Sequence, residues 1–143
     1  MQSQTTNNTI IALDVGERRV GVALVDMRAR LPHPLTTLER GETMMAQLQD
    51  IIREHRVGKV VVGLPRGLDG QHTAQTHAVE AFAVELEHAT SLPLYWQDEA
   101  VTSRQAEEEL KGRGKPYKKG DIDALSATYI LEDFVRDHPE VHQ

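Results

Sequence analysis

The chain has 143 residues, no cysteine and a formal net charge of −6, with 22 acidic and 16 basic residues. This length suits one domain, which would bury roughly 70% of its unfolded surface. The lack of cysteine excludes disulfides, zinc–thiolate sites, iron–sulfur clusters and cysteine nucleophiles. No apolar run reaches the roughly 20 residues of a membrane span. We therefore expect a cytoplasmic protein with no membrane partner.

The domain boundaries follow from the polar ends of the chain. The opening stretch is polar and uncharged and has no apolar signal region, so it predicts a disordered tail over residues 1–8. We expect a single domain over residues 9–138 and a C-terminal tail over residues 139–143, because repeats, low-complexity stretches and internal linkers are absent.

Apolar patterning predicts the first elements in chain order. Two β-branched runs, Thr9–Leu13 and Val20–Val25, lie six residues apart around a glycine and predict a hairpin. A third strand is expected near Pro34–Leu38. Helical spacing of apolar residues predicts a helix over Glu42–His55. The run Lys59–Gly63 has the composition of a short strand buried on both faces.

The second half alternates in the same way. We expect a loop containing proline and glycine over Leu64–Gly70, a helix over Thr73–His88 and a strand over Pro93–Trp96. Two further helices are expected over Thr102–Lys111 and Asp121–Asp137. The helix at 73–88 has a predicted apolar stripe of Ala74, Ala78, Phe82 and Leu86. The helix at 121–137 has a predicted apolar stripe of Ala124, Ala127, Ile130, Leu131 and Phe134. The order β-β-β-α-β-α-β-α-α predicts an α/β fold with one mixed central sheet, led by a β-hairpin, and helices on both faces.

Carboxylates stand at the ends of three of these elements. Asp14 ends the first strand, Asp98 and Glu99 end the last strand, and Asp121 and Asp123 open the last helix. Ligands of α/β sheets gather at the carboxyl ends of strands, and packing can bring a helix start beside those ends. Acids from distant parts of the sequence are therefore able to share one cavity.

Such a cluster has two interpretations. Crowded carboxylates recruit a cation, and oxygen ligands without histidine or cysteine favour Mg²⁺ or Mn²⁺, which activate water for phosphodiester cleavage. The structural alternative is local: an acid at a helix start is most often an N-cap or a partner of the helix dipole, and spacing alone favours such a role for Asp123. Asp98 and Glu99 precede a helix in the same way, and Asp14 with Gly16 fits a turn.

A basic segment precedes the last helix. Between Lys111 and Lys119 there are five cations and no acid. A segment of this kind is usually just solvated, but beside an anionic metal site it would offset repulsion between the carboxylates and a phosphodiester. The candidate phosphate contacts here are Lys115, Lys118 and Lys119.

Four segments, in order, resemble the YqgF/RuvX family of pre-16S rRNA nucleases and Holliday junction resolvase-like proteins. They are IALDVGERRVGVA at Ile11–Ala23, VVGLPRGLDG at Val61–Gly70, QDEAVTS at Gln97–Ser103 and KGDIDALSA at Lys119–Ala127. The resemblance spans about residues 10–134. It implies an RNase H-like fold, in agreement with the predicted element order.

The resemblance also implies roles for residues. The family's catalytic, metal-binding acids correspond to Asp14, Glu99 and Asp123, with Mg²⁺ or Mn²⁺ as cofactor. Asp98 belongs to the same motif without being a ligand, and Asp121 falls at a variable position.

Arginines complete the implied site. Arg19 matches the motif arginine, which would contact phosphate or brace the acids, and Arg18 beside it is a second candidate for nucleic-acid binding. The chain departs from the pattern at Ala100, where the family has an arginine, and at Gly67, where asparagine is frequent; the nearby Arg104 is the candidate substitute for the arginine.

The resemblance favours a metal-dependent nuclease that matures the small-subunit rRNA precursor, so structured RNA is the expected partner. The first alternative is a Holliday junction resolvase acting on branched DNA, which would be a two-fold dimer, so monomer and homodimer both stay open. The second is a non-catalytic nucleic-acid-binding or scaffold protein, because the fold does not fix function.

Overall fold

The computed structural model describes residues 8–65, 74–99 and 102–138, without the side chains of Glu99 and of residues 102–104. The predicted order of nine elements is confirmed. They are β1 (Thr9–Val15), β2 (Arg19–Asp26), β3 (His33–Glu39), α1 (Met44–Glu54), β4 (Val57–Pro65), α2 (Ala74–Thr90), β5 (Leu94–Glu99), α3 (Thr102–Gly112) and α4 (Lys119–Asp137). The tails predicted at 1–8 and 139–143 lie almost wholly outside the described residues, so the domain boundaries stay predictions.

The five strands form one mixed sheet in the order β3-β2-β1-β4-β5. The pairs β1–β2 and β2–β3 are antiparallel, and the pairs β1–β4 and β4–β5 are parallel. The predicted hairpin is therefore the β1–β2 pair. Because β1, β4 and β5 run the same way, their carboxyl ends meet at one edge of the sheet.

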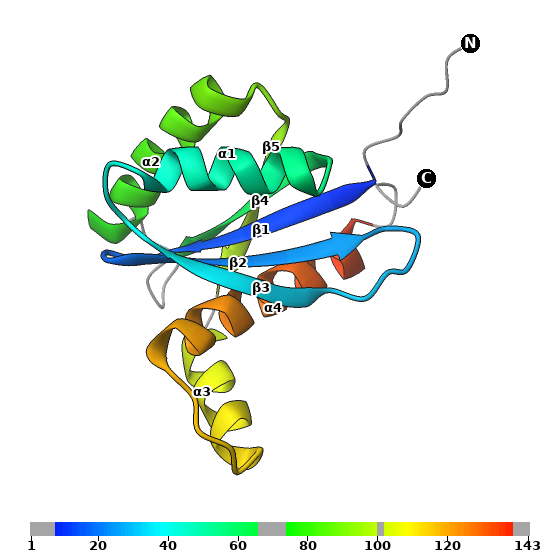
Figure 1. Cartoon of the computed structure of the whole chain (residues 1–143), viewed down its shortest axis with the longest axis vertical. Coiled ribbons are helices and arrows are strands. Elements are labelled where there is room, and N and C mark those ends of the chain that lie inside the picture. The colour runs from blue at the N-terminus through cyan, green and yellow to red at the C-terminus, as the bar shows by residue number, and fades with distance from the viewer. Residues whose placement is uncertain (1–7, 66–73, 100–101, 139–143) are drawn as a thin grey trace.

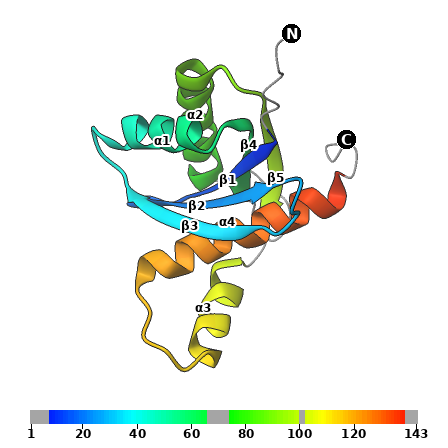
Figure 2. The ribbon, with the colours of Figure 1, turned by 45° about the vertical axis from the view of Figure 1, so that its right-hand side comes forward.

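Helices cover both faces of the sheet, as Figures 1 and 2 show, with α1 and α2 on one side and α4 on the other. Strand alternation separates two cores. Ile11, Leu13 and Val15 of β1 belong to the core beneath α1 and α2. Ile10 and Ala12 belong to the core beneath α4. Even-numbered residues of β1 therefore face α4.

The predicted stripe of α4 is confirmed and that of α2 is partly wrong. In α2 the buried residues are Thr76, Val79, Phe82, Ala83 and Leu86, whereas Ala74 and Ala78 are exposed. The apolar spacing of α2 fits two adjacent stripes, one with Ala74 and Ala78 and the other with Val79 and Ala83, and both contain Phe82 and Leu86. Contact with β4 buries the stripe that contains Val79.

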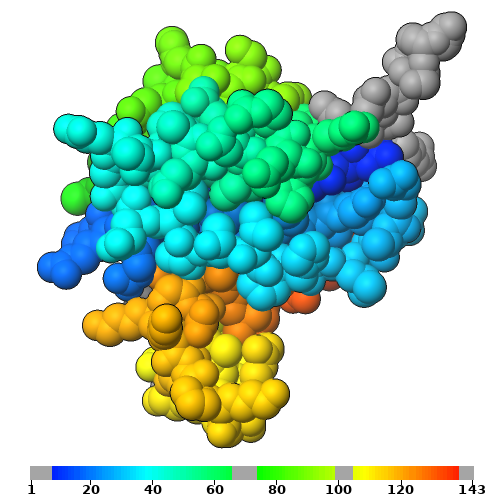
Figure 3. Space-filling view, in the orientation of Figure 1, coloured from blue at the N-terminus to red at the C-terminus, as the bar shows by residue number. Residues whose placement is uncertain are grey.

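The helix α3 packs on the first half of α4, and together they form a lobe beneath the sheet, which is yellow and orange in Figure 3. Its small core contains Ala106, Leu110 and Leu125. The Tyr129 hydroxyl donates a hydrogen bond to the Glu109 carboxylate, which lowers the pKa of Glu109. Burial, followed by the Glu109 charge, raises the pKa of Tyr129.

Two further features complete the fold. The chain leaves α3 at Gly114, whose φ of 70° is a left-handed conformation that suits glycine at a helix end. Within residues 8–65, 74–99 and 102–138, no helix combines the length and the apolar character required to cross a membrane.

Candidate active site

The structure brings Asp14 and Asp123 together over a glycine. Asp14 faces α4, is 9% exposed and pairs with Gly21 on β2. A Cβ atom added at Gly21 would lie 2.0 Å from the carbonyl oxygen of Asp123. The backbone of α4 at Asp123 therefore rests directly on Gly21, one strand away from Asp14.

Asp123 is held in place by an arginine. The Arg19 Nε donates to Asp123 Oδ2 at 2.7 Å, with 33% of the arginine side chain and 23% of the aspartate side chain exposed. Asp123 is not the cap of the helix, so that part of the predicted structural alternative is wrong. The cap is supplied by Asp121, whose Oδ2 accepts the Lys118 backbone N–H at 2.9 Å. Asp123 lies in the second turn of a helix that begins two residues before the predicted start.

Glu99 is the last residue of β5, and its backbone pairs with Pro65 at the end of β4. Strand β4 thus separates it from β1. Gly63 is the β4 residue that lies between β1 and β5 on the α4 face. It pairs with Gln97 on β5 and directly follows Val62, which pairs with Leu13 on β1. The glycine leaves that part of the sheet surface without a side chain.

The side chain of Glu99 lies outside the described part of the structure, so its role as a ligand stays a prediction. Asp98 is exposed and alternates with Glu99 along the strand. Among the side chains that the structure describes, no three of His, Cys, Asp and Glu form a metal-binding cluster.

The donors present fit a hard divalent cation. Asp14 and Asp123 offer only oxygen, which Mg²⁺ and Mn²⁺ prefer. The Arg19 guanidinium binds the Oδ2 atom of Asp123. Two acids from β1 and α4 can therefore contribute to one site, and a contribution from Glu99 stays a prediction.

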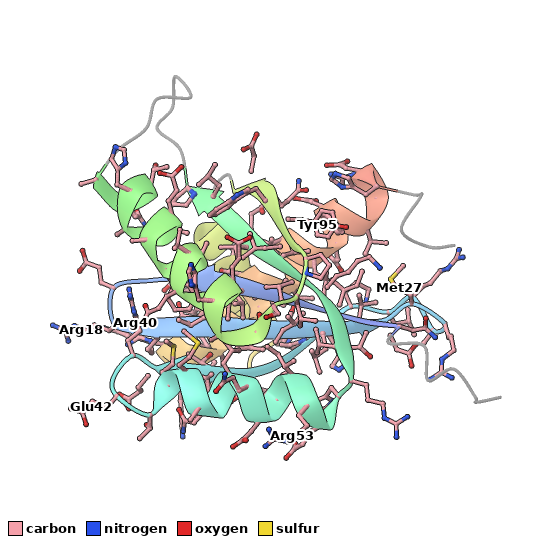
Figure 4. The ribbon with its side chains drawn as sticks, turned by 90° about the horizontal axis from the view of Figure 1, so that it is seen from above. Arg18, Met27, Arg40, Glu42, Arg53 and Tyr95 are labelled. Atoms are coloured by element: carbon pink, nitrogen blue, oxygen red, sulfur yellow. The ribbon has the colours of Figure 1, made fainter. Side chains whose placement is uncertain are left out.

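The turn between β1 and β2, directly after Asp14, is fastened by Arg40. Its backbone N–H donates to the Arg18 carbonyl at 2.8 Å, and its Nη1 donates to the Gly16 carbonyl at 3.0 Å. The guanidinium also lies 5.4 Å from the centre of the Phe82 ring on α2. Figure 4 shows Arg18 and Arg40 at the same end of the molecule, with Arg18 projecting outward. Arg18 is exposed and free to meet a phosphate from solution.

The basic segment lies at the start of α4. Lys115, Lys118 and Lys119 are exposed and make no ion pair within 4.0 Å among the described residues. The Thr37 hydroxyl on β3 donates to the Gly120 carbonyl, which fixes this end of α4 against the sheet. The predicted phosphate-binding lysines therefore lie four to eight residues before Asp123, in a segment anchored to the sheet.

Sequence reasoning missed Gly21 and Arg40. A lone glycine inside an apolar strand marks a close backbone approach, so the Val20–Val25 run held a signal for Gly21. Arg40 had no local signal, because its partners Gly16, Arg18 and Phe82 are far from it in sequence.

Comparison with known proteins yields one family and a consistent set of relatives. The model of a family described as "RuvX: Holliday junction resolvase" matches residues 8–137. A Chloroflexus aurantiacus protein named "Putative pre-16S rRNA nuclease" is 44% identical over 130 residues, which cover 88% of this chain and 85% of that protein. A Maridesulfovibrio salexigens protein of the same name is 36% identical over 130 residues, 88% and 96% of the two chains.

Solved structures agree on the fold. The RuvC structure from Thermus thermophilus aligns with a TM-score of 0.56 at 16% identity, covering 92% of this chain and 96% of that one. The fowlpox virus Holliday junction resolvase aligns with a TM-score of 0.53 at 8% identity, covering 90% and 98%. The predicted RNase H-like α/β fold is confirmed. Because the family model spans almost all of the described residues and relatives exceed 30% identity over most of both chains, this chain belongs to the RuvX family.

Proposed function

We propose that the protein is a metal-dependent nuclease that hydrolyses phosphodiester bonds in structured RNA, in maturation of the small-subunit rRNA precursor. The observation that carries this proposal is the meeting of Asp14 and Asp123 over Gly21 at the carboxyl edge of the sheet. The names of the curated relatives point to the same substrate.

In this proposal Asp14, Glu99 and Asp123 bind one or two Mg²⁺ or Mn²⁺ ions. The cation would lower the pKa of a bound water and stabilise the leaving oxygen. Arg19 holds the carboxylate of Asp123 in one orientation, through the 2.7 Å contact. Because Asp14 is buried, its carboxylate has little contact with bulk water.

In the same proposal, exposed cations bind the phosphates of the substrate. Arg18 at the β1–β2 turn and Lys115, Lys118 and Lys119 before α4 would contact phosphates on either side of the acids. These contacts offset the repulsion between a nucleic acid and a chain of net charge −6.

The test compares wild-type protein with the Asp14→Asn variant on structured RNA, with Mn²⁺ and with EDTA. We expect Asp14→Asn to lower cleavage more than about 100-fold, beyond what loss of a supporting group costs at a metal site. Asp50→Asn is the matched control, since Asp50 is an exposed acid on α1 paired with Arg53. Equal cleavage by wild type and Asp14→Asn would refute the proposal.

A second candidate substrate is branched DNA, because the matching family model is described as a Holliday junction resolvase. A four-way DNA junction added to the same assay separates the two. A resolvase cuts two strands symmetrically and is expected to be a two-fold dimer, so native mass spectrometry gives an independent answer.

The non-catalytic alternative is tested by calorimetric titration with Mn²⁺. Wild-type protein should bind the ion and Asp14→Asn should bind it more weakly. Lack of binding at millimolar Mn²⁺ would favour a scaffold role.

A further inference from the structure

A pocket of about 520 Å³ opens between the edge strand β3 and the segment that joins α3 to α4. We call it the β3–α4 pocket. Its walls are residues 34–37 of β3, residues 115–118 of the connection, and four residues of α4, namely Gly120, Asp121 and the buried Ala124 and Leu125. Its volume lies within the range of small-molecule sites, about 300–1,000 Å³. In Figure 3 this region is the junction between the blue and cyan strands and the orange segment.

The pocket has an apolar floor and a cationic rim. Leu35, Pro116 and the ring of Tyr117 contribute apolar surface, and Lys115 and Lys118 stand at the rim. One acid, Asp121, also lines the pocket, but its Oδ2 accepts the Lys118 N–H at the helix start. Arg113, a third cation in the lining, is paired with Glu109.

This combination favours a nucleotide over a bare phosphate or a peptide. A ring and apolar residues suit the face of a base, since stacking on an aromatic side chain accepts any base. Unpaired lysines at the rim suit the attached phosphate. A double-stranded backbone would need only a flat basic strip, whereas a concave apolar floor takes a base that has left its stack.

The pocket is close to the candidate acids. Thr37 in its wall pairs with Gly21, and Gly21 pairs with Asp14 on the next strand. Two strand spacings, about 10 Å, separate the backbones of Thr37 and Asp14. The start of α4 rests on Gly21 between them, so a bound strand has to pass around the start of the helix. At about 3.4 Å per nucleotide, the pocket therefore lies more than about three nucleotides along the strand from the cleavage position.

We propose that the β3–α4 pocket holds one unpaired nucleotide of the substrate, with its base against Tyr117 and its phosphate at Lys115 and Lys118. The proposal rests on the proposed nuclease function and specifies its substrate: a strand with an unpaired nucleotide a few nucleotides away from the cleaved bond. The chain has only six aromatic residues, too few for an extended stacking surface, but a single pocket needs only one ring.

The experiment measures binding by fluorescence anisotropy, in EDTA, of a labelled unstructured hexaribonucleotide and a blunt RNA duplex. Tyr117→Leu keeps apolar packing in the α3–α4 core and removes the ring, whereas Tyr117→Phe keeps the ring. Relative to Tyr117→Phe, Tyr117→Leu should weaken hexamer binding roughly 5- to 100-fold and leave duplex binding unchanged. Thermal melting of both variants verifies that the lobe is folded.

Charge is tested by a second pair of variants. Lys115→Glu reverses a rim charge, and Lys111→Glu reverses a charge on α3 outside the pocket, where Lys111 faces Glu107 at 4.0 Å. Lys115→Glu should weaken hexamer binding more than Lys111→Glu does. The proposal is overturned if Tyr117→Leu binds the hexamer as Tyr117→Phe does, if both ligands weaken equally, or if the two charge reversals are equivalent.

The two proposals fail separately. Binding in EDTA involves no cleavage, so the Asp14→Asn variant should keep the dependence on Tyr117. If wild-type protein cleaves RNA but its affinity for the hexamer does not depend on Tyr117, only the pocket proposal is refuted. If the affinity for the hexamer depends on Tyr117 but neither RNA nor DNA is cleaved, only the nuclease proposal is refuted.

Discussion

The contact between Gly21 and α4 yields the sharpest prediction. In Gly21→Ala the new Cβ would lie 2.0 Å from the Asp123 carbonyl oxygen and 2.3 Å from its carbonyl carbon, whereas real Cβ contacts essentially never fall below 3.0 Å. The neighbour is helix backbone, so no side chain can rotate away. The start of α4 must therefore move off the sheet by at least about 1 Å, and Asp123 moves with it.

That displacement has two measurable costs. Overpacking of a core typically destabilises by about 1–3 kcal/mol, and we expect Gly21→Ala to reduce the free energy of unfolding by at least that amount. A 1 Å misplacement of a catalytic group can cost about 100-fold in rate. Urea unfolding and Mn²⁺-dependent RNA cleavage measure the two effects on the same preparations.

Two other glycines are matched controls. A Cβ at Gly41 meets nothing within 4 Å, and a Cβ at Gly120 meets the Thr37 side chain at 3.4 Å, an ordinary contact. Gly41→Ala should change stability by less than about 0.5 kcal/mol, and Gly120→Ala should not destabilise the protein, because alanine is favoured over glycine within a helix. If Gly21→Ala retains the stability and cleavage rate of Gly41→Ala, the packing of α4 on Gly21 is not as described and the reasoning fails.

Three further predictions concern ion pairs and binding. Arg19→Ala frees the Asp123 carboxylate, so the Mn²⁺ concentration that gives half-maximal cleavage should rise roughly 10- to 100-fold, with a smaller change in the rate at saturating metal. An unchanged Mn²⁺ dependence would contradict a positioning role. Tyr129→Phe removes the hydrogen bond to Glu109 and should cost less than about 1 kcal/mol at pH 7, because Glu109 is exposed. The bond lowers the pKa of Glu109, so this stabilisation exists above the carboxyl's ordinary pKa and is lost as pH falls through the lowered one; urea unfolding should therefore show a smaller deficit at pH 3 than at pH 7. Lys115→Ala should reduce the slope of log affinity against log salt by about 0.7 on single-stranded RNA, measured by anisotropy, and an unchanged slope would show that Lys115 contacts no phosphate.

The element order was predictable because its signals are local. Alternating β-branched runs marked the β1–β2 hairpin, and the all-apolar run in β4 marked a strand whose residues Val60, Val61 and Val62 are completely buried. Helical periodicity placed α2 and two residues of its buried stripe, Phe82 and Leu86. It wrongly added Ala74 and Ala78, because these continue the same spacing as well as the true contact residues do. Only the sheet beneath the helix distinguishes the two stripes.

The candidate site was less predictable because its decisive contacts are long-range. Asp121 and Asp123 lie two residues apart near a helix start, and capping propensity does not separate them. Their positions are fixed by Arg19, which is 104 residues away from Asp123 in sequence, and by the packing of α4 on Gly21. The resemblance to a family favours Asp123 over Asp121 as a ligand, and in the structure it is Asp121 that accepts the hydrogen bond at the helix start.

Two contacts on adjacent strands set the position of α4. Its backbone meets Gly21 on β2 at Asp123, and its first turn accepts a hydrogen bond from Thr37 on β3 at Gly120. Because β2 and β3 are paired in register at Gly21 and Thr37, the helix start cannot slide along one strand without losing its contact with the other. The Thr37–Gly120 contact lies in the wall of the β3–α4 pocket, and the contact at Gly21 fixes the position of Asp123. A change that moves α4 on Thr37 should therefore alter both the binding of an unpaired nucleotide and the metal dependence of cleavage. A change confined to the rim lysines should alter the binding alone.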